Sequence, residues 1–265
     1  MWLDVTYPTA AECLLFRSYH RGPNPRHSTT TVMSIRYTTL VVLAAGSVLI
    51  GCDNSEELED FGPFMDITMC DPSSNQWVDE IDNPYFPLPV GQVTELEGQE
   101  DGAALKLRIS VLDETETVAG VDTRVVEERE WEDGAIKEIS RNYFAQTAAG
   151  TVCYFGEEVD IYENGQVVSH DGAWRADDAS TKPGIYMPVN PQVGQAFKQE
   201  IAPGVAKNES KILKLGETVS TPSGSYSDTV RIKDQNPLDG DSGEKVYARN
   251  VGLVLDGSVK LTSIR

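Results

Sequence analysis

Basic residues and long apolar runs are both scarce in this sequence. Its 22 lysines and arginines stand against 42 aspartates and glutamates, so the net charge at pH 7 is −20. This charge would repel a phosphate backbone, which argues against nucleic acid as a partner. The main apolar segment, residues 38–50, has thirteen residues without a charge. Because a membrane-spanning helix needs roughly 20 apolar residues, we predict no such helix here.

Helical periodicity is also missing, and strand patterns take its place. No stretch beyond residue 83 repeats its apolar residues every 3.6 positions. Residues 104–112 alternate between apolar and polar, as expected of a half-buried strand. Three dipeptides predict hairpin turns between strands: Asp133-Gly134, Asn164-Gly165 and Asp256-Gly257. We therefore predict an all-β fold, an antiparallel meander that forms a half-barrel or a sandwich.

The predicted turns also predict which residues face each other across the hairpins. Counted outward from Asp133-Gly134, Trp131 should face Ile136 and Glu130 should face Lys137. Counted outward from Asp256-Gly257, Val254 should face Val259. These pairs are apolar with apolar or opposite in charge, which supports the register.

An export signal is indicated by the residues around the apolar run. Arg36 precedes the run and acidic residues follow it, and its length is typical of the core of a signal peptide. Leu49-Ile50-Gly51-Cys52 resembles the lipobox of bacterial lipoproteins. The resemblance implies acyl chains on Cys52, cleavage before it and anchorage in a lipid bilayer, which is stable when two or more chains are attached. The alternative is a buried apolar segment that ends at a core cysteine.

This signal divides the chain into unequal parts. We expect residues 1–32 to be a non-native or disordered extension, with the signal peptide at 33–51 and an acidic tether and transition at 52–80. The exported protein would be membrane-anchored at the cell envelope, on its periplasmic or outer face. Asp53 directly after the lipidated position resembles an inner-membrane retention signal, which favours the inner membrane. From Cys52 onward, 18 basic and 40 acidic residues give a net charge of −22 over 214 residues.

Two cysteines, Cys70 and Cys153, remain if Cys52 is lipidated. In an oxidising compartment an even remainder suggests a disulfide, and the alternative is two separate buried thiols. Beyond the apolar run there is also only one histidine, His170. One histidine and a pair of bridged cysteines are too few for a zinc site within this chain.

Three motifs recur after 101 to 104 residues. Val90-Gly91-Gln92 returns as Val193-Gly194-Gln195, Glu116-Thr117-Val118 as Glu217-Thr218-Val219, and Tyr143-Phe144-Ala145 as Tyr247-Ala248 with tyrosine matched to tyrosine. A near-constant interval over separated motifs predicts a tandem duplication, with β repeats at 81–184 and 185–265. The alternative is that similar strand and turn patterns repeat by chance.

Four segments together resemble a family of uncharacterised bacterial secreted proteins and lipoproteins. The segments are residues 81–88 (IDNPYFPL), 131–134 (WEDG), 154–157 (YFGE) and 183–188 (PGIYMP). The resemblance covers residues 81 to 265 and implies no known chemistry. The family often has tryptophan at the position of Cys153, so the disulfide would be peculiar to this branch. The predicted half-repeat is also similar to β half-barrels that envelope lipoproteins use for binding.

Candidate ligand-binding residues fall into an acidic loop and an aromatic group. Asp239, Asp241 and Glu244 resemble the start of a calcium loop, but Asn250 at the twelfth position excludes an EF-hand, so calcium stays open only as a looser surface site. No other cofactor is expected. The aromatic group is either core or the wall of a ligand cleft, and its cleft candidates are Trp131, Tyr143, Tyr154 and Trp174.

The sequence as a whole favours a membrane-anchored envelope lipoprotein that acts as a binding or structural module rather than an enzyme. A carboxylate-dependent hydrolase is the first alternative, although 40 acidic residues offer no means of choosing a catalytic pair. A subunit of an envelope complex is the second. The small-molecule or protein partner is not specified by any motif.

Overall fold

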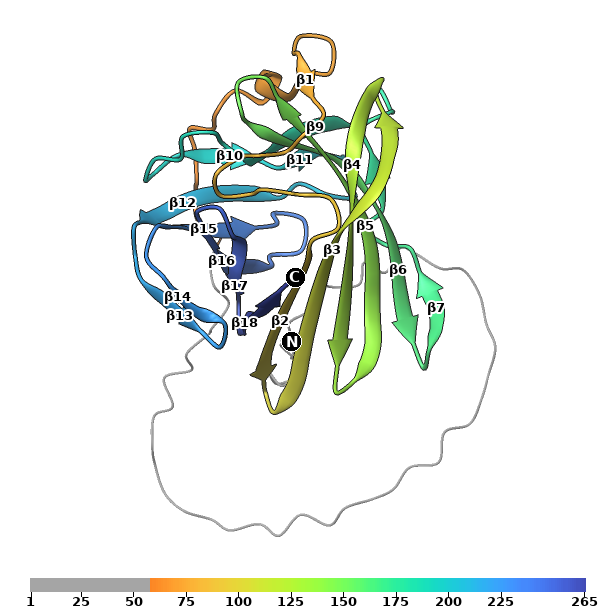
Figure 1. Cartoon of the computed structure of the whole chain (residues 1–265). Helices are drawn as coiled ribbons and strands as arrows, with labels where there is room; N and C mark the ends of the chain where they lie inside the picture. Colours follow the sequence, from red (N-terminus) through yellow and green to blue (C-terminus); the bar gives the residue numbers. More distant parts are fainter. Residues whose placement is uncertain (1–57) are drawn as a thin grey trace, which may run out of the picture.

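The computed structural model describes residues 58–265, and Cys52 lies outside the described residues (Figure 1). Within this range the regular structure is β, apart from one turn of 3-10 helix, η1 (Ile67–Cys70). No helix among the described residues has the length and apolarity to cross a membrane. Every ladder between named strands is antiparallel, so the predicted all-β antiparallel fold is confirmed.

The eighteen strands vary from long hairpin arms to two-residue pairings. In chain order they are β1 (Trp77–Val78), β2 (Val93–Glu100), β3 (Ala103–Val118), β4 (Val121–Glu132), β5 (Ala135–Thr147), β6 (Val152–Glu163), β7 (Gln166–Ser169), β8 (Trp174–Arg175), β9 (Lys182–Met187), β10 (Ala196–Lys198), β11 (Glu200–Ile201), β12 (Glu209–Leu215), β13 (Val219–Thr221), β14 (Gly224–Tyr226), β15 (Thr229–Gln235), β16 (Ser242–Ala248), β17 (Gly252–Asp256) and β18 (Val259–Ile264).

One continuous sheet contains sixteen of these strands. Its order is β10-β12-β15-β16-β17-β18-β2-β3-β4-β5-β6-β9-β11, with β1, β7 and β8 attached to its side. The strands from β2 to β6 form one meander and those from β15 to β18 form another, and the two meet where β18 pairs with β2. In Figure 1 the olive to green strands of the first meander stand beside the blue strands of the second.

A bent strand brings the two ends of this sheet together. β10 pairs with β12 and β11 pairs with β9, and only Gln199 separates β10 from β11. The sheet is therefore nearly closed and barrel-like. Gly184 in β9 lies directly against this bend, because a Cβ atom on it would be 2.3 Å from the carbonyl oxygen of Lys198. The absence of a side chain at Gly184 is thus a condition for the close approach of the backbones.

The alternation predicted for residues 104–112 is confirmed. Leu107 and Val111 belong to the buried core, and Leu105 and Ile109 pack against it. The two cations between them turn to the other face, where Arg108 and Lys106 approach the carboxylate of Glu95 at 2.7 and 3.4 Å. The core therefore forms on one face of the long strands, and a row of ion pairs forms on the other.

Glu95 should make the stability of the fold depend on pH in the acid range. A hydrogen bond from Arg108, supported by the charge of Lys106, lowers the pKa of Glu95 from 4.5 to about 2. Since the pKa is lower in the folded state, this stabilisation is present above about pH 4.5 and is lost as the pH falls towards 2. We expect Glu95→Gln to reduce the loss of unfolding free energy between pH 6 and pH 3 by about 1 to 2 kcal/mol in urea titrations. An unchanged pH dependence in the variant would contradict this assignment.

The predicted register is correct next to the turn of the first hairpin, wrong farther along that hairpin, and wrong at the turn of the third. Trp131 faces Ile136 as predicted, but a β-bulge follows and Glu130 faces Glu138 instead of Lys137. In the third hairpin Asp256, not Val254, faces Val259, so the turn consists of Gly257 and the residue after it. A bulge adds one unpaired residue to one strand, which shifts all later pairs.

Residues 82–85 are hydrogen-bonded to both meanders. The side-chain amide oxygen of Gln146 in β5 accepts hydrogen bonds from the backbone N–H groups of Asp82 and Asn83, at 3.1 and 2.9 Å. From the other meander, the N–H of Asn250 donates to the carbonyl oxygen of Pro84 at 2.6 Å. This part of the 81–88 motif therefore has a structural role, because both meanders hold it.

Matching hydrogen bonds occur at the recurring motifs. The hydroxyl of Thr123 donates to the carbonyl oxygen of Glu116 at 2.7 Å, and that of Thr229 donates to the carbonyl oxygen of Glu217 at 2.8 Å. Both threonines are completely buried, and each stands one residue after an aspartate. These bonds define corresponding positions in residues 81–184, the first half, and residues 185–265, the second half. The tandem duplication itself stays a prediction.

Candidate functional site

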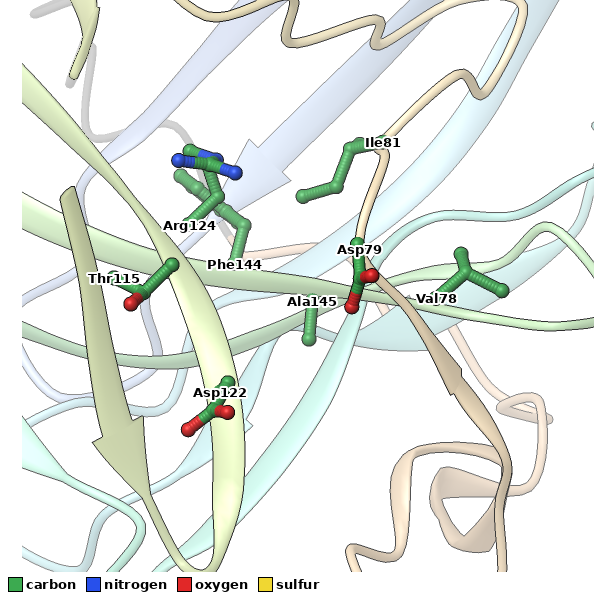
Figure 2. Close-up of a pocket in the computed structure, with 8 residues that line it drawn as sticks. All are labelled: Val78, Asp79, Ile81, Thr115, Asp122, Arg124, Phe144 and Ala145. Atoms are coloured by element: carbon green, nitrogen blue, oxygen red, sulfur yellow. The ribbon is translucent and has the colours of Figure 1, made fainter. Parts of the chain in front are cut away.

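A cavity of about 240 Å³ opens between the first half and the segment that precedes it (Figure 2). Three elements of the sheet form most of its wall: β3, β4 and β5. Val78 at the end of β1, with Asp79 and Ile81 after it, forms the rest. The lining residues are Val78, Asp79, Ile81, Thr115, Asp122, Arg124, Phe144 and Ala145.

Local features of the strands explain why this space is not filled. The register between β3 and β4 shifts between Val111 and Thr115, and such a bulge bends the strand away from regular pairing. The pairing of β4 with β5 ends at Phe144. Beyond this point the short β1 pairs with β5 instead of β4, with Val78 opposite Gln146. The segment after β1 therefore crosses the end of β5 and leaves a cavity beside it.

The floor of the cavity is rigid and apolar. Phe144 has an exposed fraction of 1%, and its ring centroid lies 5.1 Å from that of Phe86 and 4.8 Å from that of Tyr186. Ile81 is buried as well. Aromatic rings packed edge to face in this manner resist displacement, so the floor has a fixed shape.

Charged groups of both signs stand above this floor. Arg124 donates from Nη1 to the carbonyl oxygens of Leu112 and Glu114, each at 3.3 Å. Asp122 accepts a hydrogen bond on Oδ1 from the hydroxyl of Thr117 at 2.7 Å. Because a guanidinium has five N–H donors, the bonds of Arg124 within residues 58–265 leave Nε and Nη2 for another partner. The cavity can therefore offer a donor fork and carboxylate oxygens at the same time.

The corresponding position in the second half is filled by the protein itself. Asp228, which like Asp122 precedes a buried threonine, accepts a hydrogen bond from the hydroxyl of Tyr85 at 2.8 Å. Its other oxygen accepts one from Nε of Arg249 at 2.6 Å, and Arg249 also lies 4.7 Å from the ring of Tyr85. These bonds, from Tyr85 first and Arg249 second, lower the pKa of Asp228. A guanidinium and a phenol thus satisfy this carboxylate.

A second polar cluster lies inside the nearly closed sheet. The ammonium of Lys245 is 3.7 Å from Asp234 and 3.8 Å from Asp256. Asp234 also accepts hydrogen bonds from Ser210 at 2.6 Å and Gln199 at 3.2 Å. Burial raises the pKa of Asp234, and the charge of Asp256 raises the pKa of Lys245. These charges are paired with one another within the protein, so the cluster is neutralised without a ligand.

Two tyrosines connect this cluster with the aromatic floor. The hydroxyls of Tyr186 and Tyr247 are 3.4 Å apart, and burial raises the pKa of Tyr186 to about 12. Both hydroxyls therefore stay protonated at neutral pH. The ring of Tyr186 packs against Phe144 below the cavity, so the interior of the sheet supports the cavity wall mechanically.

The aromatic residues predicted to line a cleft lie in different places. Tyr154 and Trp174 contact each other with ring centroids 5.4 Å apart, and both are buried in the core. Tyr143 is also buried, beneath the guanidinium of Arg175 at 5.1 Å. Trp131 lies apart from them and lines an open hollow of about 610 Å³ together with Gly98 and Arg108. The structure therefore does not gather the four residues in one cleft.

Two of the three carboxylates in the acidic loop considered for calcium, those of Asp239 and Glu244, have partners within the protein. Asp239 accepts hydrogen bonds from the N–H of Asp241 at 3.0 Å and from the side chain of Asn236 at 2.8 Å. Glu244 forms an ion pair with Arg231 at 2.6 Å. Within residues 58–265 no group of three or more metal-ligating side chains is found.

Cys70 and Cys153 form a disulfide, with their Cα atoms 5.7 Å apart. The bond joins η1 to β6 in the buried core. It also holds the start of the domain near Trp77, whose ring packs 5.1 Å from that of Phe155. The disulfide thus fixes the segment that continues into the wall of the cavity.

Comparison with known proteins gives one distant neighbour. No family model matches the chain, and no curated protein matches it. Among solved structures, the crystal structure of a provisionally assigned lipoprotein from Parabacteroides distasonis aligns with 69% of this chain and 99% of that chain. The two are 16% identical with a TM-score of 0.31, and neither value establishes a shared family.

Proposed function

We propose that this chain is an exported bacterial lipoprotein whose β domain binds a small ligand in the cavity of Figure 2. The observation that carries the binding role is that Arg124 and Asp122 line one cavity together with the buried ring of Phe144. Most small-molecule sites have this composition, an apolar wall with a few placed polar groups. The anchoring role is supported by the lipobox-like residues Leu49-Ile50-Gly51-Cys52.

The distance along the chain between the proposed anchor and the domain is short. The backbone of Glu59 already exchanges hydrogen bonds with the side chain of Gln235, at 3.1 and 2.8 Å. Only the few residues from Cys52 to Glu59 separate the lipid from this contact, and they span at most about 25 Å. A lipidated Cys52 would therefore hold the domain close to the membrane surface. The chain from residue 52 onward has a net charge of −22, which would not attract the domain to anionic lipid headgroups. The acyl chains would therefore supply the attachment.

Cys52→Ala should release the protein from the membrane. We expect the wild-type chain in the membrane pellet of a bacterial host and the variant in the soluble fraction, because no acyl chain can be attached to alanine. Cys13→Ala is the matched control, and it should stay in the pellet because that cysteine precedes the proposed cleavage site. A Cys52→Ala variant that remains in the pellet would contradict the lipoprotein proposal. Labelling with a radioactive or alkynyl fatty acid gives an independent readout.

A carboxylate-dependent hydrolase is the second candidate, favoured by one observation. Asp79 and Asp122 both line the same cavity, and hydrolysis of glycosides requires two carboxyl groups that face one substrate. The two candidates differ in what happens to the ligand. A binding protein returns the ligand unchanged after prolonged incubation, whereas mass spectrometry would detect cleavage products from a hydrolase.

A further inference from the structure

We propose that the cavity binds a small zwitterion, a molecule that carries an amine or guanidinium group and a carboxylate, such as a free basic amino acid. The cationic group would contact Asp122, and the carboxylate would contact Arg124. This inference rests on the proposed binding role of the same cavity and adds the chemical class of the ligand.

The cationic half of the ligand is inferred from the second half of the protein. Asp122 and Asp228 are corresponding residues, because each precedes a buried threonine that donates to a glutamate carbonyl oxygen. At Asp228 the guanidinium of Arg249 lies at 2.6 Å and the hydroxyl of Tyr85 at 2.8 Å. The protein therefore already shows which groups suit a carboxylate at this position.

At Asp122 the protein supplies no such cation. Its hydrogen bond within the described residues comes from the neutral hydroxyl of Thr117. The residue of the first half that corresponds to Arg249 is Gln146. Its side chain donates a hydrogen bond to the carboxylate of Asp82 and accepts hydrogen bonds from the backbone N–H groups of Asp82 and Asn83. Asp79, on the opposite wall, adds a second exposed carboxylate. A ligand ammonium or guanidinium would thus take the place that Arg249 takes in the second half.

The anionic half of the ligand is inferred from Arg124. The corresponding position in the second half is Val230, so the guanidinium is a feature of the first half alone. Arg124 uses Nη1 for the carbonyl oxygens of Leu112 and Glu114, which fixes the side chain. Its remaining edge matches the geometry of a carboxylate, which a guanidinium binds through two parallel hydrogen bonds.

The positions of these charges fit a molecule with separated ends. Figure 2 shows Arg124 close to Phe144, Asp122 well away from Arg124, and Asp79 and Ile81 together on the segment across from them. Between the charges the surface is apolar, formed by Phe144, Ala145 and Ile81. The volume of about 240 Å³ equals the share of about eight water molecules. A single amino acid with a methylene chain suits this space, and a polymer does not.

Isothermal titration calorimetry with four probes tests the proposal. The mature protein in detergent micelles would be titrated with L-arginine, with L-lysine, with agmatine, which lacks the carboxylate, and with valerate, which lacks the cation. We expect L-arginine or L-lysine to bind at least about tenfold more tightly than agmatine and valerate, a difference of about 1.4 kcal/mol.

Two variants should separate the two ends of the ligand. Asp122→Asn should lower the affinity for the zwitterion and for agmatine by about tenfold each, because both ligands carry a cationic group. Arg124→Gln should weaken the zwitterion by about tenfold and leave agmatine unchanged, because agmatine has no carboxylate for Arg124 to bind. Asp228→Asn is the matched control, and it should lower the melting temperature without a change in affinity.

The outcomes distinguish this inference from the proposed function. Equal binding of L-arginine and agmatine to the wild type, or equal losses for both in Arg124→Gln, would overturn the zwitterion class. If no zwitterion binds but another small molecule raises the melting temperature of the wild type and not of Asp122→Asn, the class is wrong and the binding role stands. If neither zwitterions nor a broad compound set bind, both are wrong.

Discussion

Replacing Cys70 by serine should lower the free energy of unfolding by about 4 to 5 kcal/mol. The disulfide with Cys153 closes a loop with a sequence separation of 83. A cross-link of this length removes much of the conformational freedom of the unfolded chain, and chain-entropy models give about 4 to 5 kcal/mol for it. Both cysteines are also fully buried, so the serine hydroxyl would add a cost of its own. Urea unfolding followed by tryptophan fluorescence measures the difference.

The contribution of the cross-link itself can be separated from that of the side chain. Reduction of the wild-type protein with a thiol should produce a loss close to that of the variant, because it opens the same loop without a new side chain. The double variant Cys70→Ser with Cys153→Ser should be no more than slightly less stable than either single variant. A single variant as stable as the oxidised wild type would contradict the bridge.

Gly184→Val should destabilise the protein by more than about 3 kcal/mol or prevent folding. A Cβ atom at this position would lie 2.3 Å from the carbonyl oxygen of Lys198 and 2.5 Å from the carbonyl carbon and oxygen of Gln199. These atoms belong to the backbone of the bent strand, so they cannot move aside as a flexible side chain would. The substitution would therefore push β9 away from β11 and open the sheet at the bend.

Gly243→Val is the matched control for this experiment. Gly243 also lies in a strand, β16, but a Cβ atom there meets no other atom within 4 Å, and its φ is not positive. We expect a change within about 0.5 kcal/mol, typical of an exposed position. If the two variants had the same midpoint of thermal unfolding, the close approach at Gly184 would not be a condition of the fold.

The parts of the fold that depend on nearest neighbours could be predicted from the sequence. The alternation of residues 104–112 and the turn at Asp133-Gly134 follow from the local geometry of strands and hairpins. Bulges could not be predicted in this way, because the bulge beside Trp131 has no side-chain signature and the pairs beyond it shift. The joining of β18 to β2 was not predictable either, since two distant strands with similar patterns pair according to the curvature of the whole sheet.

The candidate site was hidden from the sequence for a related reason. Asp122 and Arg124 closely follow the recurring motif Glu116-Thr117-Val118, yet nothing local distinguishes them from the other charged residues of a strongly acidic chain. The cavity exists because residues 78–81 cross the end of β5, and that placement depends on β1 and on the nearby disulfide. The comparison of the two halves is the signal that identifies them, because it shows Asp228 with a cation and Asp122 without one.

The pairing of β18 with β2 has a consequence for how the protein folds. The backbones of Val93 and Arg265 exchange two hydrogen bonds, at 2.8 and 3.1 Å, although nearly the whole domain separates them in the chain. The edge of β2 therefore stays without its partner until β18, far along the chain, has been synthesised. Such long-range contacts slow folding, and an exposed strand edge can pair with other chains in the interval.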